Sequence, residues 1–141
     1  MAVARAAGYS GKPLWQKLGL EPGMRVYVAD PPHNVDALLA GAPQDLARLA
    51  RLGACDVALV FVTARRAVEG AVARVAPKLA PGGMLWFAWP KKASGVPTDV
   101  TEDGLRELVL PHGWVDVKVC AIDTTWSGLK FLRRKLRQAE A

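Results

Sequence analysis

Polar and charged side chains follow the ends of several apolar, strand-like segments in this chain. The segments span residues 24–29, 56–62 and 84–89, and a later turn at 123–127 joins two further segments. In an open sheet of parallel strands, ligands bind beyond the carboxyl ends of the strands. We therefore predict one ligand-binding edge made by the residues that follow these strands. Its predicted members are Asp30, His33, Thr63, Lys91, Lys92, Asp123, Trp126 and Ser127.

Each of these side chains suggests a chemistry and also a plainer role. Lys91 and Lys92 could hold an anionic group as point charges, or they could be a solvated loop. Trp126 could stack on a base or another planar ligand, or it could pack as a lid over the core. His33 could act as an acid or base near neutral pH, although a lone loop histidine is more often a surface residue. Asp123 could pair with one of the lysines or cap the turn.

We find no catalytic or metal-binding motif in the sequence. The serines lack the strand-to-helix turn of a hydrolase nucleophile, and residues 8–12 lack the spacing of a phosphate-binding loop. Cys55 and Cys120 lie in or beside apolar segments, as reduced core cysteines of a cytoplasmic protein do. With the two histidines they do not show the spacing of a metal site. We therefore predict no catalytic residue and no metal.

The order of predicted elements indicates an α/β fold. Helical patterns cover 12–20, 35–40, 64–79 and 101–110, and strand patterns cover 24–29, 56–62, 84–89, 114–122 and 128–134. Residues 42–53 fit either a helix or a short edge strand. Alternating strands and helices predict a parallel sheet, whereas the last two strands are too close in sequence for a crossover helix. We predict a three-layer Rossmann-like sheet of about five or six strands, mostly parallel, ending in an antiparallel hairpin.

The chain is long enough for one domain, and its charge is uneven. We predict a single α/β domain over residues 1–141, with an N-terminal arm and helix over 1–20 and a basic tail over 135–141. The net charge is +6, and five of the 19 basic residues lie within 130–137. This run could bind nucleic acid, or it could be an exposed strand edge that frays into a solvated tail, which we favour. No apolar run approaches the ~20 residues of a membrane helix, and no secretory signal precedes the domain, so we expect a cytoplasmic protein and no membrane partner.

Three segments resemble the class I S-adenosylmethionine-dependent methyltransferases. They are the leader Leu-Gly-Leu-Glu-Pro-Gly-Met-Arg-Val at 18–26, the segment Leu-Ala-Pro-Gly-Gly-Met-Leu at 79–85, and the closing hairpin. The resemblance implies a cofactor site at the end of the first strand. However, the glycine loop that normally wraps the cofactor there is missing, because Asp30-Pro-Pro-His-Asn34 follows the strand and no glycine occurs before Gly41.

The chain also has few residues between Asp30 and Asp56 for a full second strand with an acidic ribose-binding tip and a third strand. We read Asp30-Pro31-Pro32 as a stiff turn. Since Pro31, Pro32 and His33 bring bulk, we expect the space beyond Asp30 to be filled or narrow.

Four further strings resemble a small bacterial family of domains of unknown function (DUF3052). They are Gly-Tyr-Ser-Gly-Lys-Pro-Leu at 8–14, Trp-Pro-Lys-Lys-Ala-Ser-Gly-Val at 89–96, Thr-Asp-Val-Thr-Glu-Asp at 98–103 and Asp-Thr-Thr-Trp-Ser-Gly-Leu-Lys-Phe at 123–131. This resemblance implies a cytoplasmic methyltransferase-like domain without an established activity, and it supplies no catalytic residues.

These observations favour a non-catalytic, methyltransferase-like domain that uses no cofactor. It would bind a small anionic ligand or a protein partner at the carboxyl edge of the sheet. One alternative is a divergent methyltransferase that holds S-adenosylmethionine without glycines. A second alternative is nucleic-acid binding through the basic tail.

Overall fold

The computed structural model describes residues 11–135, which form a Rossmann-like α/β fold around one six-stranded sheet. The strands are β1 (Arg25–Ala29), β2 (Ala47–Leu49), β3 (Cys55–Phe61), β4 (Leu79–Pro90), β5 (Trp114–Ala121) and β6 (Trp126–Arg133). They lie in the order β2-β1-β3-β4-β6-β5. The four strands from β2 to β4 are parallel, and β6 is antiparallel to both β4 and β5. The predicted parallel sheet with a closing hairpin is therefore confirmed.

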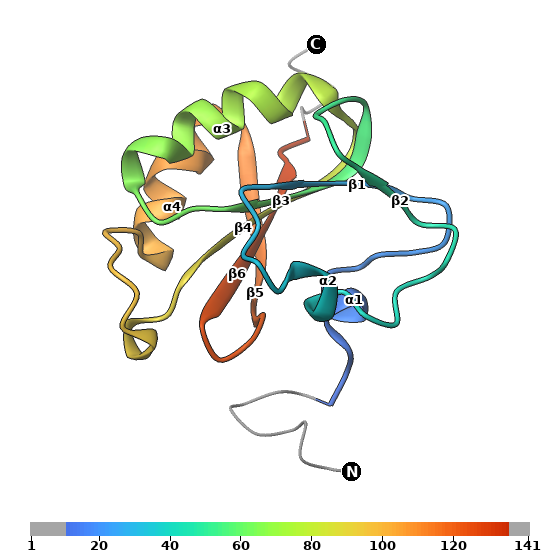
Figure 1. Cartoon of the computed structure of the whole chain (residues 1–141). Coiled ribbons are helices and arrows are strands. Elements are labelled where there is room, and N and C mark those ends of the chain that lie inside the picture. Colours follow the sequence, from blue (N-terminus) through green and yellow to red (C-terminus); the bar gives the residue numbers. More distant parts are fainter. Residues whose placement is uncertain (1–10, 136–141) are drawn as a thin grey trace.

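Helices cover both faces of the sheet and complete the three layers. They are α1 (Leu14–Lys17), α2 (Val35–Leu38), α3 (Val68–Val75) and α4 (Glu102–Val109). Figure 1 shows α3 and α4 on one side of the sheet and α1 and α2 on the other. No helix among residues 11–135 is both long enough and apolar enough to cross a membrane.

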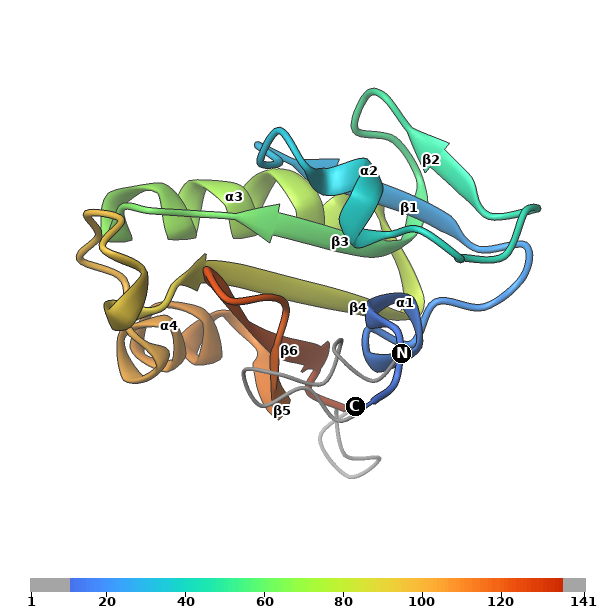
Figure 2. The same ribbon diagram turned by 60° about the horizontal axis from the view of Figure 1, so that its bottom comes forward.

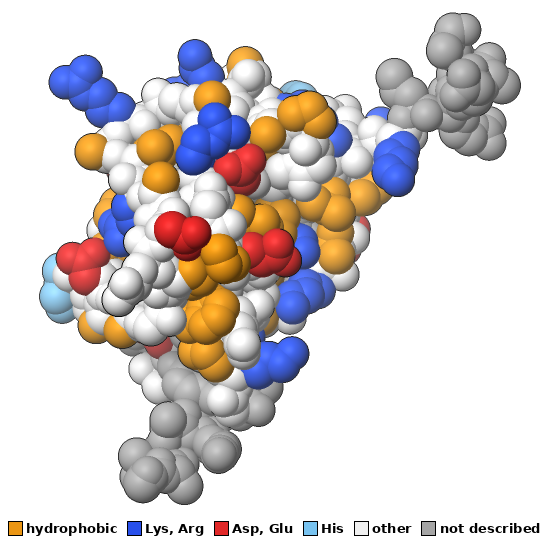
Figure 3. Space-filling model, turned by 90° about the vertical axis from the view of Figure 1, so that its right-hand side faces the viewer, with side chains coloured by type: hydrophobic (Ala, Val, Ile, Leu, Met, Phe, Trp, Pro, Cys, Tyr) orange, Lys and Arg blue, Asp and Glu red, His pale blue; other side chains and the backbone are white. Residues whose placement is uncertain are grey.

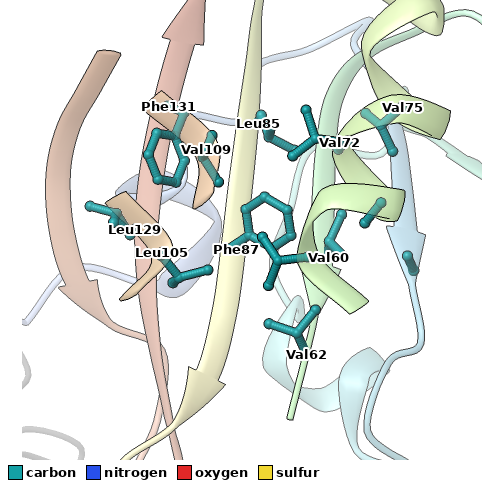
Figure 4. Close-up of a cluster of buried hydrophobic side chains, with 14 of the residues drawn as sticks. Val60, Val62, Val72, Val75, Leu85, Phe87, Leu105, Val109, Leu129 and Phe131 are labelled. Atoms are coloured by element: carbon teal, nitrogen blue, oxygen red, sulfur yellow. The ribbon is translucent and has the colours of Figure 1, made fainter. Parts of the chain in front are cut away.

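The larger core lies between the sheet and the α3/α4 layer. Phe87 in β4 is fully buried, and its ring packs edge-on against Phe131 in β6, with the ring centres 6.2 Å apart. Figure 4 shows side chains of β3, β4, β6 and both helices meeting around these two rings. On the other face, the indole of Trp86 is fully buried and donates a 3.1 Å hydrogen bond from Nε1 to the carbonyl of Leu18, after α1.

Local sequence explains where the two longer helices form. In α3, an apolar stripe at helical spacing is buried against the sheet; its members are Val68, Ala71, Val72 and Val75. In α4, the Thr101 side chain caps the first turn by accepting a 2.9 Å hydrogen bond from the Gly104 backbone amide, as the sequence predicts.

The structure settles or corrects several local predictions. The ambiguous segment 42–53 contains the short edge strand β2 rather than a helix, and the predicted helix 12–20 is reduced to the single turn of α1. The turn predicted at 80–83 lies within β4. There β4 pairs with β3 at Leu79 and again only from Met84, so the intervening residues bulge out of the ladder.

The basic run at 130–137 is not an exposed strand edge, so that prediction is wrong. Lys130 and Arg133 belong to β6, which lies between β4 and β5, and the edge strand at this end of the sheet is β5. The Arg133 guanidinium lies 4.9 Å above the Trp114 ring and donates a hydrogen bond to the carbonyl of Ala76. Residues 1–10 and 136–141, which include the first part of the string at 8–14 and Arg137 of the basic tail, lie outside the described residues.

Candidate functional site

A pocket of about 530 Å³ opens at the carboxyl ends of β1 and β3, beside α3. Asp30, which follows β1, and Thr63, which follows β3, line it together with Trp126 at the start of β6. Arg66 and Arg74 line the wall formed by α3 and the turn before it. We call this the β1–α3 pocket. It lies where the parallel sheet predicts a ligand site.

The expectation that the space beyond Asp30 is filled or narrow is wrong. Pro31, Pro32 and His33 do not line the pocket, and the His33 side chain is exposed. The physical reason lies in the backbone of Asp30, whose φ is +51°, the only positive value at a non-glycine residue among residues 11–135. This left-handed conformation turns the chain sharply at the end of β1, which leaves space over the strand end. Aspartate tolerates this conformation better than most residues, and it replaces the glycine that such a turn usually requires.

Trp126 both packs on the core and lines the pocket. Its ring meets the buried Phe61 ring edge-on at 5.0 Å, with an angle of 90° between the ring planes. The turn before it is held by Asp123, whose Oδ1 accepts 2.8 Å hydrogen bonds from the backbone amides of Thr125 and Trp126. Asp123 thus caps the turn, one of its two predicted roles, and thereby fixes one wall of the β1–α3 pocket.

The two arginines of the pocket differ from their neighbour Arg65. Arg65 is committed to the fold, because its guanidinium pairs with Glu107 at 3.3 Å and its backbone amide donates to Asp99 at 2.7 Å. Arg66 and Arg74 are exposed and form no ion pair with any residue of the described chain. Two unpaired guanidinium groups facing one hollow are suited to a phosphate or carboxylate, since guanidinium groups bind such anions through paired hydrogen bonds.

A second pocket of about 600 Å³ lies at the end of β4, the start of β6 and the start of α4. Lys91, Lys92 and Ser127 line it, and its apolar lining includes the largely buried side chain of Trp89. Glu102, which is ion-paired with Arg106 at 2.6 Å, stands on the α4 side of this pocket. We call it the β4–α4 pocket.

The structure therefore distributes the predicted site over two pockets. Asp30, Thr63 and Trp126 line the β1–α3 pocket, and Lys91, Lys92 and Ser127 line the β4–α4 pocket. Asp123 and His33 line neither of them.

Sequence reasoning missed the α3 wall of the β1–α3 pocket. Its side chains are Ala67, Gly70, Ala71 and Arg74, whose spacing places them on one helical face. The small residues leave the hollow open, and Arg74 also lines it. The signal that could have found this wall is a stripe of small residues ending in arginine, directly beside the apolar stripe of the same helix.

The remaining reactive side chains do not form a site. Burial raises the pKa of the Cys55 and Cys120 thiols, so both are protonated at neutral pH, and neither forms a disulfide within residues 11–135. The described chain contains no cluster of histidine, cysteine and carboxylate side chains that could hold a metal ion.

Comparison with known proteins identifies the fold. The structure is similar to a ribosomal protein L11 methylase from Lactobacillus delbrueckii subsp. bulgaricus, with a TM-score of 0.59 and 10% identity over 86% of this chain and 75% of that one. It is also similar to the N-methyltransferase NodS from Bradyrhizobium japonicum WM9 (TM-score 0.55, 12% identity, 86% and 93% of the two chains). An rRNA methylase from Streptococcus thermophilus matches with a TM-score of 0.55 and 11% identity over 90% of this chain and 99% of that one. No protein-family model and no curated protein sequence matches the chain. The chain thus has the class I methyltransferase-like fold.

Proposed function

We propose that this chain is a non-catalytic, methyltransferase-like domain that binds a small anionic ligand in the β1–α3 pocket. The observation that carries the proposal is the pair of unpaired arginines, Arg66 and Arg74, lining a hollow at the carboxyl ends of two parallel strands. The Trp126 ring offers a flat surface on the same hollow. A ligand with an anionic group and a planar group would satisfy both walls.

The side chains of the pocket support binding better than acid–base chemistry. Its described lining holds one carboxylate, Asp30, and two guanidinium groups, with no imidazole or thiol. Guanidinium groups remain protonated in proteins and so do not shuttle protons near neutral pH. Such a lining is suited to binding an anionic ligand.

The test is a ligand panel followed by substitution of the arginines. Inorganic phosphate, pyrophosphate and AMP would be titrated while the melting temperature and the heat of binding are measured, because a ligand that binds the native state raises its apparent stability. We expect saturable binding of at least one of them, and we expect Arg66→Ala and Arg74→Ala each to weaken it by about 10-fold or more, as for the loss of a hydrogen bond to a charged group.

Arg51→Ala is the matched control, because Arg51 is also exposed but lines neither pocket. An equal loss of affinity in this variant would mean that net charge, rather than the pocket, holds the ligand. Absence of any shift with the whole panel would contradict the proposal.

A divergent S-adenosylmethionine-dependent methyltransferase is the second candidate, favoured by the open space beyond Asp30. The pocket is lined by Asp30 and Thr63 at the strand ends where the resemblance to methyltransferases implies a cofactor site. Titration with S-adenosylmethionine and S-adenosylhomocysteine, together with transfer of a radiolabelled methyl group to cell extract, tests this candidate. Saturable stabilisation by either compound with label transfer would replace the non-catalytic proposal.

We also infer that the chain is a cytoplasmic member of the small bacterial DUF3052 family. The strings at 89–96, 98–103 and 123–131 support this, and they coincide with the loops of the β4–α4 pocket and with the hairpin turn. An alignment of the chain with this family would test the inference, which requires that the family shares the three strings. Conservation of Lys91, Lys92 and Ser127 would also indicate that the β4–α4 pocket has a function.

A further inference from the structure

One face of the β5–β6 hairpin combines basic and apolar side chains without a carboxylate. In the strand register, Lys118 of β5 is opposite Lys130 of β6, and Val115 is opposite Leu132. Lys130 is in turn opposite Trp86 of β4, whose side chain packs with α1. These four hairpin side chains therefore lie on the side of the sheet that carries α1, and we call this surface the basic hairpin face.

The charges on this face are all positive. Neither Lys118 nor Lys130 forms an ion pair with another residue of the described chain. Burial lowers the pKa of Lys130, and the neighbouring Lys118 lowers it further. The charged groups that act on nearby Cys120 are again lysines, Lys17 and Lys118.

On the opposite side of the same hairpin, the acidic side chain of β5 is ion-paired. There Asp116 of β5 accepts a 2.8 Å hydrogen bond from Arg106 of α4, which also pairs with Glu102 and Asp103. Figure 2 shows α4 beside the hairpin, with α1 at the other end of β4. The acidic side chain of β5 is thus ion-paired on the α4 side, whereas Lys118 and Lys130 on the α1 side form no ion pair within residues 11–135.

Two lysines placed directly opposite each other destabilise a sheet, because like charges repel across the strands. An occupant that brings carboxylates would remove this cost. We propose that the basic hairpin face binds an acidic segment of a partner protein, whose carboxylates contact Lys118 and Lys130 while its apolar side chains cover Val115 and Leu132. This inference is independent of the β1–α3 pocket.

Apolar exposure favours a protein segment over a nucleic acid. The Val115 side chain is 39% exposed, and Leu132 is half-buried. Sheets that bind single-stranded nucleic acids stack bases on exposed aromatic rings. Trp86, the aromatic residue directly opposite Lys130, is fully buried and so is not available for stacking.

The side of the molecule that carries the β2 edge differs in its charges from the basic hairpin face. On the side that carries the β2 edge, acidic and basic side chains are interspersed among apolar ones (Figure 3). One basic residue of β2, Arg48, pairs with Asp36 at 3.2 Å. Mixed charges of this kind provide no comparable attraction for an acidic segment.

The occupant should lie across the face rather than extend the sheet. The register of β5 shifts at Val117, where a bulge interrupts the ladder with β6. A bulge and a nearby lysine are common ways by which an edge strand avoids pairing with another strand. Side-chain contacts with the face are therefore the expected mode of binding.

The proposal can be tested with a defined peptide. A fluorescein-labelled ten-residue peptide that repeats Glu-Glu-Val-Val, and so presents both residue types on each side of an extended chain, would be titrated with the full chain at low salt, and anisotropy would give its affinity. We expect Lys118→Gln/Lys130→Gln to weaken binding at least 10-fold. The control Arg51→Gln/Lys78→Gln also removes two positive charges, but from exposed positions on other surfaces that line neither named pocket, and should leave the affinity within about 2-fold. Carbodiimide coupling should attach peptide carboxylates to Lys118 and Lys130.

A second variant separates binding from folding. Lys118→Glu places a carboxylate opposite Lys130, so it should abolish peptide binding while leaving the melting temperature unchanged or higher. Tighter binding of oligo-dT than of the peptide, lost in the same variants, would assign the face to nucleic acid instead. No peptide binding at low salt, or equal losses in the control variant, would also overturn the proposal.

Discussion

The two halves of the sheet differ in how firmly they are built. In the β4–β6–β5 half, the strands are eight to twelve residues long, and rings and aliphatic side chains interlock with α3 and α4. In the β1–β2 half, the strands have five and three residues, and Tyr27 and Leu49 on the α3 side are only half-buried. The β1–α3 pocket lies at the border between the two halves. The open hollow therefore arises where the well-packed half of the fold ends.

Two side-chain truncations, one in each half, should show this difference in packing as the largest difference in stability. Phe87→Ala removes a fully buried ring that packs against Phe131, so it should lower the free energy of unfolding by about 3–5 kcal/mol. Leu49→Ala removes a half-buried side chain from β2 and should cost only about 1 kcal/mol. Denaturant unfolding of both variants measures the two values. Equal losses would show that the β1–β2 half is as tightly packed as the other.

Two glycine substitutions compare the packing around the bulged part of β4 with the packing before β3. A methyl group at Gly83, in the bulged part of β4, would lie 2.7 Å from Leu79 Cγ and 3.0 Å from the Asp56 carbonyl oxygen. Gly83→Ala should therefore destabilise the fold by about 1–3 kcal/mol, as overpacking does. At Gly53, before β3, no atom lies within 4 Å of the same methyl group, so Gly53→Ala should change stability by about 0.5 kcal/mol or less. Thermal unfolding of both variants tests this, and a neutral Gly83→Ala would mean that the bulge relaxes easily.

Helix capping provides a smaller test in each half. Thr101 caps α4 through its side chain, whereas Asn34, at the same position before α2, makes no side-chain cap. Thr101→Ala should cost about 1 kcal/mol, and Asn34→Ala should cost clearly less. Chemical denaturation with helix content followed by circular dichroism measures both. A larger loss for Asn34→Ala would mean that the Asn34 side chain stabilises the start of α2 by a contact other than a cap.

The same difference explains how much the sequence predicts. The well-packed half could be predicted because each of its strands and helices has a sequence pattern of its own, such as the apolar stripe of α3 and the Thr101 cap. The order of the elements predicts that Asp30, Thr63 and Trp126 lie at one edge of the sheet, but the open shape of the pocket could not be predicted in this way. That shape depends on the left-handed backbone at Asp30 and on the small residues Gly70 and Ala71. These small residues leave space for a pocket only because the fold places α3 beside the end of β1. No glycine directly follows β1, yet the chain turns there through the left-handed backbone of Asp30.

The smallest expected effect concerns two ion pairs, one in each half. Asp56 of β3 accepts hydrogen bonds from the Arg25 side chain and backbone amide, at 3.2 and 2.8 Å, and these lower the pKa of Asp56 below its usual value of about 3.8. Arg106 likewise lowers the pKa of Asp116, which ties β5 to α4. Because each carboxyl has a lowered pKa in the folded state, its contribution to stability is complete above about pH 4 and is lost as the pH falls through the folded-state pKa.

Asp56→Asn and Asp116→Asn should therefore each lower the melting temperature at pH 6 and have less effect near pH 2. The loss for Asp56→Asn should be at most about 1 kcal/mol, because the pair is partly exposed. Melting temperatures measured from pH 2 to pH 6 for the wild type and both variants test this. If Asp56 is what attaches β1 to the rest of the sheet, its substitution should also weaken ligand binding in the β1–α3 pocket, whereas Asp116→Asn should not. Equal ligand affinity in both variants would show that Asp30 and the pocket are held in place without the Arg25–Asp56 pair.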